Sequence, residues 1–297
     1  MLPLTVGLLW AADPAGIVAT VTASFATGSD TKALQALAAY RTSRGVTPEY
    51  LEAFSWLARA EAGSRNYRAA DQYAQEISSL STAQLQTRPL DREPHLPIAL
   101  GAAIEVEATV LAAEGRRSEA VTFLQERAKT FARTSIVTRI RKNLLLLTLE
   151  GKPAPALENM TLPAGKPALL FFWAHWCPDC KADAPILMQI RKEYGARGLV
   201  FLAPTQKYGY VAGGADAAPA VETAYIEQVR RTYYAGLIDS PVVVSEANFT
   251  RYGASTTPTL VLVDRAGVVR MYHPGAMTYV ELKTAVERVM NANVRTK

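Results

Sequence analysis

Two cysteines, Cys177 and Cys180, stand three positions apart and are the only cysteines among the 297 residues of the chain. They follow an apolar, strand-like run and open a helix-like stretch, a context in which two thiols readily form a reversible disulfide. Because free N–H groups and the positive end of a helix dipole favour an anion, the Cys177 thiol should ionise more readily than a free thiol. Cys180, one turn further along, is placed to resolve the mixed disulfide that an attacking Cys177 forms. The pattern indicates thiol–disulfide exchange, with the disulfide as the redox group and no separate cofactor.

Metal binding is the main alternative for this spacing. A zinc site usually has four protein ligands, and the chain offers no second cysteine pair. His175 could be a third ligand, whereas His95 and His273 lie far away without ligand spacing. Soft thiolates also suit Cu(I), so a copper-handling protein that uses Cys177, Cys180 and His175 remains an alternative function. The strand-then-helix context favours a redox pair, and we predict no metal site.

A strand, a turn and a helix are needed to position the two thiols. The apolar run 168–173 predicts a buried strand that leads into the cysteine segment, and residues 181–194 predict the helix that follows. Alternating strands and helices continue to the end of the chain, which predicts an α/β domain whose central sheet is covered by helices on both faces. The further predicted strands are 199–203, 260–263 and 268–272, and the further predicted helices are 221–234 and 279–290.

Residues 172–181, Phe-Trp-Ala-His-Trp-Cys-Pro-Asp-Cys-Lys, together with Pro185, resemble the active-site segment of the thioredoxin superfamily. Residues 257–267, Thr-Pro-Thr-Leu-Val-Leu-Val-Asp-Arg-Ala-Gly, resemble the cis-proline strand of the same family and its following turn. Gly151–Pro155 and the residues after Cys180 are similar to the exported thiol–disulfide oxidoreductases of the TlpA/ResA type. The resemblance implies a thioredoxin-like fold with a central mixed sheet for residues 151–297 and a role in cell redox homeostasis.

Asp183 is the candidate for moving protons at the second thiol. It stands three residues after Cys180, so on a helix it shares the face of that cysteine. The family usually has glutamate at this place, and Asp183 is a shorter substitute. Many thioredoxins carry a buried carboxylate two residues before the first tryptophan, where this chain has Phe171. The alternative interpretation of Asp183 is a solvated carboxylate on the helix surface.

Pro258 is expected in the cis form, and Thr257 before it is the expected main-chain contact for a substrate. In the family the loop before this proline packs against the cysteine pair and leaves its backbone free to pair with an extended substrate segment. An ordinary trans proline at the start of a strand is the alternative.

Trp176, Pro178 and Asp179 flank Cys177 and are the other expected substrate-contacting residues. Asp179 disfavours the Cys177 thiolate by like-charge repulsion, whereas a protonated His175 would favour it. Tryptophan at a strand–helix junction also packs cores, which is the alternative role for Trp176. Because the related exported proteins are mostly reductants and Asp179 does not stabilise the thiolate of a strong oxidant, we expect a disulfide reductase rather than an oxidase.

Residues 13–150 are helical in pattern throughout and rich in alanine and leucine, which predicts an all-α domain before the thioredoxin-like one. Residues 50–77 and 98–131 each predict two helices, broken near Gly63 and Gly115. The small and aromatic residues in these pairs resemble tetratricopeptide hairpins, with generic antiparallel packing as the alternative. At 151–155, a glycine and two prolines predict the domain boundary. A second function class is a binding or adaptor module whose helical half holds a protein partner.

The glycine- and alanine-rich stretch between Pro204 and Pro219 carries Tyr208 and Tyr210. A connection of this length inside a compact domain is often functional, so a lid or substrate-contact loop is one interpretation. A disordered excursion is the other.

The composition is that of an ordinary globular protein, with 49% hydrophobic and 20% charged residues and a net charge of +5. The short basic cluster 139–142 is explained by a solvated helix end, so no nucleic-acid partner is predicted. Residues 1–12 are apolar and end in small residues, which we interpret as the remnant of a secretory signal without its basic region. No other stretch is long enough to predict a membrane span. We expect an exported, periplasmic or otherwise extracytoplasmic protein whose partners are protein thiols or disulfides and an upstream electron donor.

Overall fold

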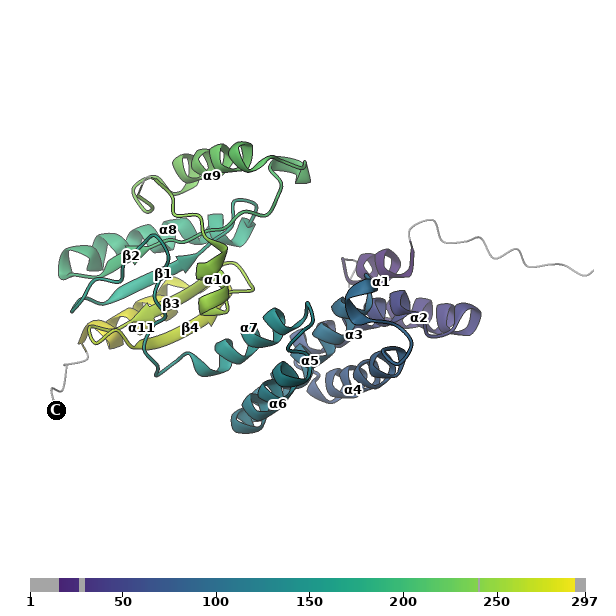
Figure 1. The fold of residues 1–297 in the computed structure, drawn as a ribbon. Coiled ribbons are helices and arrows are strands. Elements are labelled where there is room, and N and C mark those ends of the chain that lie inside the picture. Colours follow the sequence, from purple (N-terminus) through teal and green to yellow (C-terminus); the bar gives the residue numbers. More distant parts are fainter. Residues whose placement is uncertain (1–15, 27–29, 240, 292–297) are drawn as a thin grey trace, which may run out of the picture. The chain divides into compact units, whose positions relative to one another are not determined.

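The computed structural model describes residues 16–26, 30–239 and 241–291 (Figure 1). The chain divides into two compact units, Met1–Ile140 and Arg141–Lys297. The interpretation of residues 1–12 as a signal remnant therefore falls outside the residues that the structure describes.

The first unit, in its described residues, consists of helices and their connections, as predicted. α3 begins at Pro48, after the N-cap Thr47, whose side chain accepts a hydrogen bond from the backbone N–H of Tyr50. The predicted breaks are confirmed, because α3 ends at Gly63 and α5 ends shortly before Gly115. The elements are α1 (Gly16–Ala26), α2 (Asp30–Arg44), α3 (Pro48–Gly63), α4 (Tyr67–Gln84), the 3-10 helix η1 (Leu90–Arg92), α5 (Leu96–Ala113), α6 (Arg117–Thr130) and the start of α7 (Val137–Thr148).

Helix α5 packs against α3, α4 and α6 within the first unit. By length and apolar composition α5 could span a bilayer, so the expectation that no stretch is long enough to do so is wrong. In the structure, however, 56% of this helix is buried. Core helices share that composition, so it does not by itself indicate a membrane span. Ala70 in α4 and Ala120 in α6 are both fully buried. Both tetratricopeptide hairpins and generic antiparallel helices pack small residues in this way.

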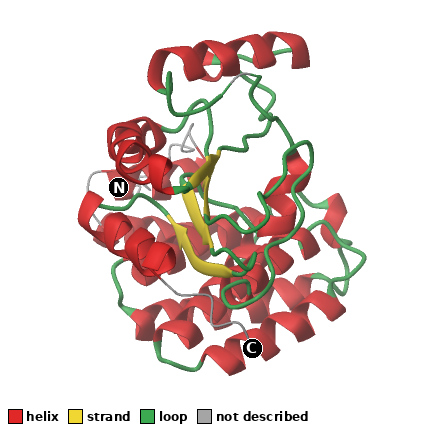
Figure 2. Ribbon diagram, turned by 90° about the vertical axis from the view of Figure 1, so that its left-hand side faces the viewer, coloured by secondary structure: helices red, strands yellow, loops and turns green. Residues whose placement is uncertain are grey.

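The second unit has the predicted fold class, a mixed sheet with helices on both faces (Figure 2, strands in yellow). Its described strands form one sheet in the order β2-β1-β3-β4, in which β1 and β2 are parallel and the other neighbours are antiparallel. The elements are β1 (Ala168–Phe172), α8 (Pro178–Tyr194), η2 (Gly195–Arg197), β2 (Val200–Leu202), η3 (Ala212–Gly214), α9 (Pro219–Tyr233), α10 (Glu246–Tyr252), β3 (Thr259–Val263), β4 (Val269–Pro274) and α11 (Tyr279–Asn291).

Strand β1 lies inside the sheet and is buried along its whole length. Successive strand residues point to opposite faces, so Leu169 and Phe171 join the core formed with α8, α9 and α11, whereas Leu170 and Phe172 join the core formed with α10. Burial on both faces explains the uninterrupted apolar run in the sequence. The strand therefore holds the cysteine segment that follows it on a rigid base.

The segment Gly151–Pro155, predicted as a hinge, lies along the edge of the sheet. Its first N–H donates to the Val269 carbonyl at 2.8 Å, and the Val269 N–H donates to the Lys152 carbonyl at 2.9 Å. Leu149, just before it, is buried in the core on the α10 face. Because these contacts tie the end of α7 to the sheet, the two units divide at residue 140 rather than at 150.

Gly253→Ala is expected to destabilise the second unit. Gly253 ends α10 at a φ of +69°, and an added Cβ would come within 2.8 Å of both the Leu145 Cβ and the Lys142 carbonyl oxygen. The left-handed backbone and the clash together should lower the free energy of unfolding by about 2 to 4 kcal/mol, measured by denaturant titration. Gly267→Ala is the matched control, because Gly267 has a φ of +76° with nothing within 4 Å of the added carbon. Equal losses in the two variants would contradict the packing argument.

Candidate active site

The cysteine pair lies where β1 ends and α8 begins. Cys177 is the N-cap of α8, and Pro178 occupies the first helical position, where the missing N–H of proline costs nothing. Cys177 and Cys180 are joined in a disulfide, and the Cys180 N–H donates to Cys177 Sγ at 3.0 Å. The predicted attacking sulfur thus lies at the end of the helix that favours a negative charge.

The turn before β3 brings Thr257 and Pro258 to the disulfide. The Thr257–Pro258 peptide bond is cis, so the alternative of a trans proline is wrong. The Thr257 carbonyl oxygen lies 3.3 Å from Cys177 Sγ. The Pro258 carbonyl accepts the Gly275 N–H at 2.7 Å, which ties the turn to the end of β4. The two sequence motifs therefore meet at one place in the fold.

Three of the predicted contact residues form an exposed rim around a buried sulfur. Trp176 is 44% exposed, whereas Cys177 is only 1% exposed and Cys180 is fully buried. Pro178 and Asp179 are exposed as well. In this disulfide form a visiting protein therefore meets the rim before it meets Cys177.

Asp183 is buried one turn after Cys180, at 5% exposure, so its interpretation as a solvated surface carboxylate is wrong. Burial raises its pKa from 3.8 to about 6, and repulsion by Asp179 adds to this, while the Met277 N–H and His273 act in the opposite direction. Its Oδ2 has no hydrogen-bond partner among the described residues. A buried carboxyl with a pKa near neutrality can both take and give a proton.

His175, two residues before Cys177, points to a carboxylate that sequence reasoning did not identify. Its Nε2 lies 3.1 Å from Glu222 Oε1, and both side chains are almost completely buried. Burial lowers the pKa of His175, with Glu222 opposing this shift. A neutral ring whose Nε2–H donates to Glu222 fits this contact, and it supplies no positive charge to favour the Cys177 thiolate.

The described residues contain no group of three or more His, Cys, Asp or Glu side chains that could hold a metal ion. His175, the third ligand in the metal alternatives, directs Nε2 to Glu222. With both cysteines in a disulfide, this form of the site presents no thiolate ligand.

Comparison with known proteins agrees with this geometry. Residues 156–290 match a family described as a thioredoxin-like domain. The thiol:disulfide interchange protein DsbE of Yersinia pestis is 30% identical over 144 residues, which cover 44% of this chain and 68% of that protein. The chain belongs to the thioredoxin-like thiol:disulfide interchange proteins. It is by family a thiol–disulfide oxidoreductase, as the cysteine pair predicts.

Two further known proteins match a similar share of the chain. The thioredoxin-like protein YneN of Bacillus subtilis is 27% identical over 148 residues, 46% of this chain and 79% of that protein. A solved thiol:disulfide interchange protein from Chlorobium tepidum is 21% identical with a TM-score of 0.35, covering 48% of this chain and 99% of that chain.

Sequence reasoning missed two buried polar residues near the active site of this interchange protein. Glu222 lies in the first turn of α9, where an acidic residue is typical of any helix start. Tyr234 is fully buried, with its ring centroid 4.9 Å from that of Trp173 and a hydroxyl that lacks a partner among the described residues. Burial, and then the charge of Asp183, raise the pKa of Tyr234. In the sequence, only the unusual length of the connection before Glu222 indicated that this part of the chain could be functional.

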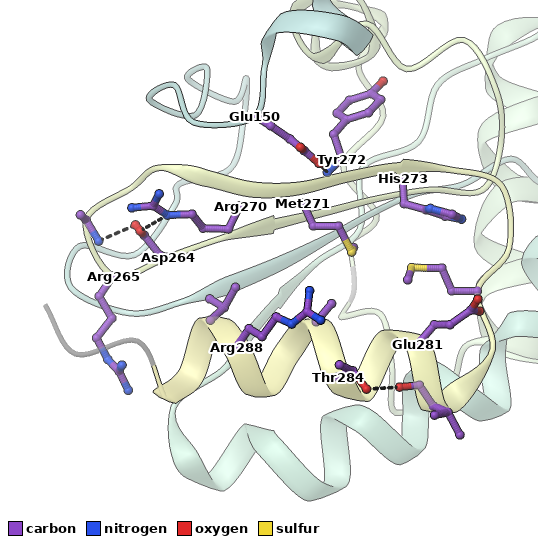
Figure 3. Close-up of a pocket in the computed structure, with 15 residues that line it drawn as sticks. Glu150, Asp264, Arg265, Arg270, Met271, Tyr272, His273, Glu281, Thr284 and Arg288 are labelled. Carbon is purple, nitrogen blue, oxygen red and sulfur yellow. Dashed lines mark hydrogen bonds and ion pairs between the residues drawn. The ribbon is translucent and has the colours of Figure 1, made fainter. Parts of the chain in front are cut away.

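A cavity of about 1270 Å³ lies between β4 and α11, and the two cysteines do not line it (Figure 3). Its lining mixes apolar and charged side chains, among them Arg270, which pairs with Asp264 at 2.6 Å. His273 and Met277 line the cavity and also act on Asp183. The cavity therefore extends to residues beside the buried carboxyl.

Proposed function

We propose that this interchange protein exchanges disulfides with protein clients through Cys177 and Cys180, and that it works as a reductant. The observation that carries the proposal is the disulfide at the start of α8, with the Thr257 carbonyl 3.3 Å from Cys177 Sγ. This arrangement places the attacking sulfur at the start of a helix, beside a backbone segment with which an extended client can pair. Thr257, Trp176, Pro178 and Asp179 are the proposed client contacts.

In the reducing direction, the Cys177 thiolate attacks one sulfur of a client disulfide. An S–S bond forms between Cys177 and the client, the client's own S–S bond breaks, and the released client thiolate takes up a proton. The Cys180 thiol then loses its proton, attacks Cys177 Sγ and releases the second client thiolate, which is protonated in turn. The client gains two electrons and two protons, and the protein is left with the Cys177–Cys180 disulfide.

The disulfide must then be reduced by an upstream dithiol donor, which loses the same two electrons and two protons. Extracytoplasmic compartments are where client disulfides persist, so we place the protein there. Asp179 supports a role as a reductant. A strong oxidant needs a stabilised thiolate in its reduced form, and the Asp179 carboxylate beside Cys177 disfavours that thiolate.

Asp183 is the proposed proton acceptor for Cys180. It follows Cys180 by one turn of α8 and is buried, with an unpartnered Oδ2. A pKa of about 6 leaves it ionised at neutral pH and able to take the Cys180 proton when that thiol attacks. Pro258 and the cis bond before it keep the Thr257 carbonyl at the sulfur that is being attacked.

Turnover of insulin disulfides with a dithiol donor tests the reaction, and a glutathione redox titration tests its direction. We expect turnover, and a midpoint more negative than about −200 mV, unlike the about −120 mV of a strong oxidant. A midpoint near the oxidising extreme would overturn the reductant role. Absence of turnover, with a partner still bound by a Cys177→Ser variant, would favour the adaptor alternative. Copper that co-purifies with the reduced protein would favour metal handling.

A further inference from the structure

The proposed reaction leaves one buried charge without a role. Glu222, at the start of α9, is 1% exposed. Its carboxylate accepts hydrogen bonds from the backbone N–H groups of Tyr208 and Gly209 and contacts His175 Nε2 at 3.1 Å. Glu222 therefore joins the connection after β2 to the residue that stands two places before Cys177.

Only an ionised carboxylate suits this position. Two backbone N–H groups donate to Glu222, and His175 is a third donor in the tautomer that carries its hydrogen on Nε2, whereas a carboxylate has no hydrogen of its own to oppose them. Burial alone would raise the pKa of Glu222, but the hydrogen bonds from Tyr208, Gly209 and His175 hold it below its ordinary value. Glutamine at this position would turn an amide N–H toward one of the donors. The contacts are thus specific for the acid.

Three side chains beside the disulfide form what we call the aromatic wall, namely Trp176, Tyr208 and Tyr210, and Glu222 accepts the backbone N–H of one of them, Tyr208. The Tyr208 ring meets the Trp176 ring edge-on, with centroids 5.5 Å apart. The His175 ring lies behind the wall, with its centroid 5.6 Å from that of Tyr208 and 5.5 Å from that of Tyr210. Tyr208 also packs against the core that contains Cys177. The wall thus borders a sulfur that is almost fully covered.

We propose that Glu222 is a positioning residue that holds Tyr208 against Trp176, and that the aromatic wall thus formed contacts an apolar or aromatic side chain next to the client's cysteine. This inference rests on the proposed function, because it names the surface on which a protein client docks. A client in contact with the wall gains apolar burial there, whereas a small disulfide reagent is too short to use it. The wall therefore lowers KM for protein clients and leaves KM for small disulfides unchanged.

Glu222→Gln and Tyr208→Ala test the proposal from its two sides. For each variant we expect KM for a protein disulfide to rise about tenfold relative to KM for a small aliphatic disulfide reagent, with a smaller change in kcat. Tyr208→Ala removes the ring of the wall that contacts Trp176 but keeps the backbone N–H groups that donate to Glu222, so it still tests the proposal if Glu222→Gln fails to fold.

Trypsin reads out the holding contact directly. Trypsin cleaves after lysine, and the exposed Lys207 stands just before Tyr208, whose N–H donates to Glu222. Glu222→Gln should therefore speed cleavage of the folded protein at this bond several-fold. Glu287→Gln is the matched control, because Glu287 accepts the Tyr194 hydroxyl at 2.8 Å on α11, outside the site. It should alter neither the KM ratio nor the cleavage rate.

An unchanged KM ratio in both test variants, or an equal change in Glu287→Gln, would overturn the inference. Failure of the proposed function looks different, because the wild-type protein would then turn over neither the protein disulfide nor the small one. The cleavage assay needs no turnover and would still decide whether Glu222 holds the connection after β2.

Discussion

Cys177→Ser is expected to abolish disulfide exchange, with turnover of a protein disulfide falling by more than about a thousandfold. A serine hydroxyl does not ionise near neutral pH, and its oxygen cannot form the mixed disulfide through which exchange proceeds. Cys180 cannot replace it, since that side chain is fully buried behind the N-cap of α8. Insulin turnover with a dithiol donor measures the loss.

Cys180→Ser is the matched control for this loss, because it removes the same atom type but keeps the attacking sulfur. It should accumulate a mixed disulfide between Cys177 and the client instead of releasing product. Mass spectrometry under non-reducing conditions detects the adduct and identifies the client. Retained turnover in Cys177→Ser, or a client adduct on the Cys180 of that variant with none on the Cys177 of Cys180→Ser, would reverse the assigned roles of the two cysteines.

Elements with local constraints could be predicted from the sequence. β1 and β3 are buried along their length, so each appears as an uninterrupted apolar run. The cysteine pair and Pro258 are recognisable because their chemistry depends on residue type and short spacing. The helix predicted at 181–194 begins in the structure at Pro178, earlier than predicted. The start was missed because the cysteines break the apolar pattern.

Contacts between distant segments could not be predicted in the same way. α10 has seven residues, too few to show a helical period. The contact of Glu222 with His175 depends on the path of the connection after β2, which has no periodic pattern. The burial of Cys177 is likewise a property of the assembled rim, because the same residues in an extended peptide would expose it.

Asp183→Asn is expected to slow the resolution step about a hundredfold at neutral pH, within the range of general acid–base catalysis. In the wild-type protein the carboxyl, with its pKa of about 6, is ionised above that pH and can take the Cys180 proton. The rate of resolution should therefore fall as pH drops through about 6, and this inflection should be missing in the variant. Rapid-quench measurement of the mixed disulfide between pH 5 and about 8 checks both points. An inflection near 6 that survives in Asp183→Asn would assign it to another group.

The same substitution should stabilise the fold at neutral pH. Burial raises the pKa of Asp183 from 3.8 to about 6, so the folded protein binds its proton more tightly than the unfolded chain and stability falls as pH rises between these values. Asp183→Asn removes this penalty, a gain of roughly 2 to 3 kcal/mol above pH ~6 that vanishes below pH ~4.

Asp264→Asn is the control of opposite sign. Asp264 is also nearly buried, but hydrogen bonds from Val268 and Ala266 and the Arg270 guanidinium outweigh burial and hold its pKa below the ordinary value. The Asp264 carboxylate therefore stabilises the fold at pH values above the pKa of Asp264 in the unfolded chain. This stability is lost as pH falls through the lower pKa that Asp264 has in the folded protein. Denaturant titrations at pH ~2, ~4 and ~7 should show that Asp183→Asn gains stability over the wild-type protein between pH ~4 and ~7. Asp264→Asn should be less stable than the wild-type protein at both of these pH values, and its deficit should shrink only below pH ~4. A loss in both would mean that Asp183 is held as a structural carboxylate and not as the proton acceptor of Cys180.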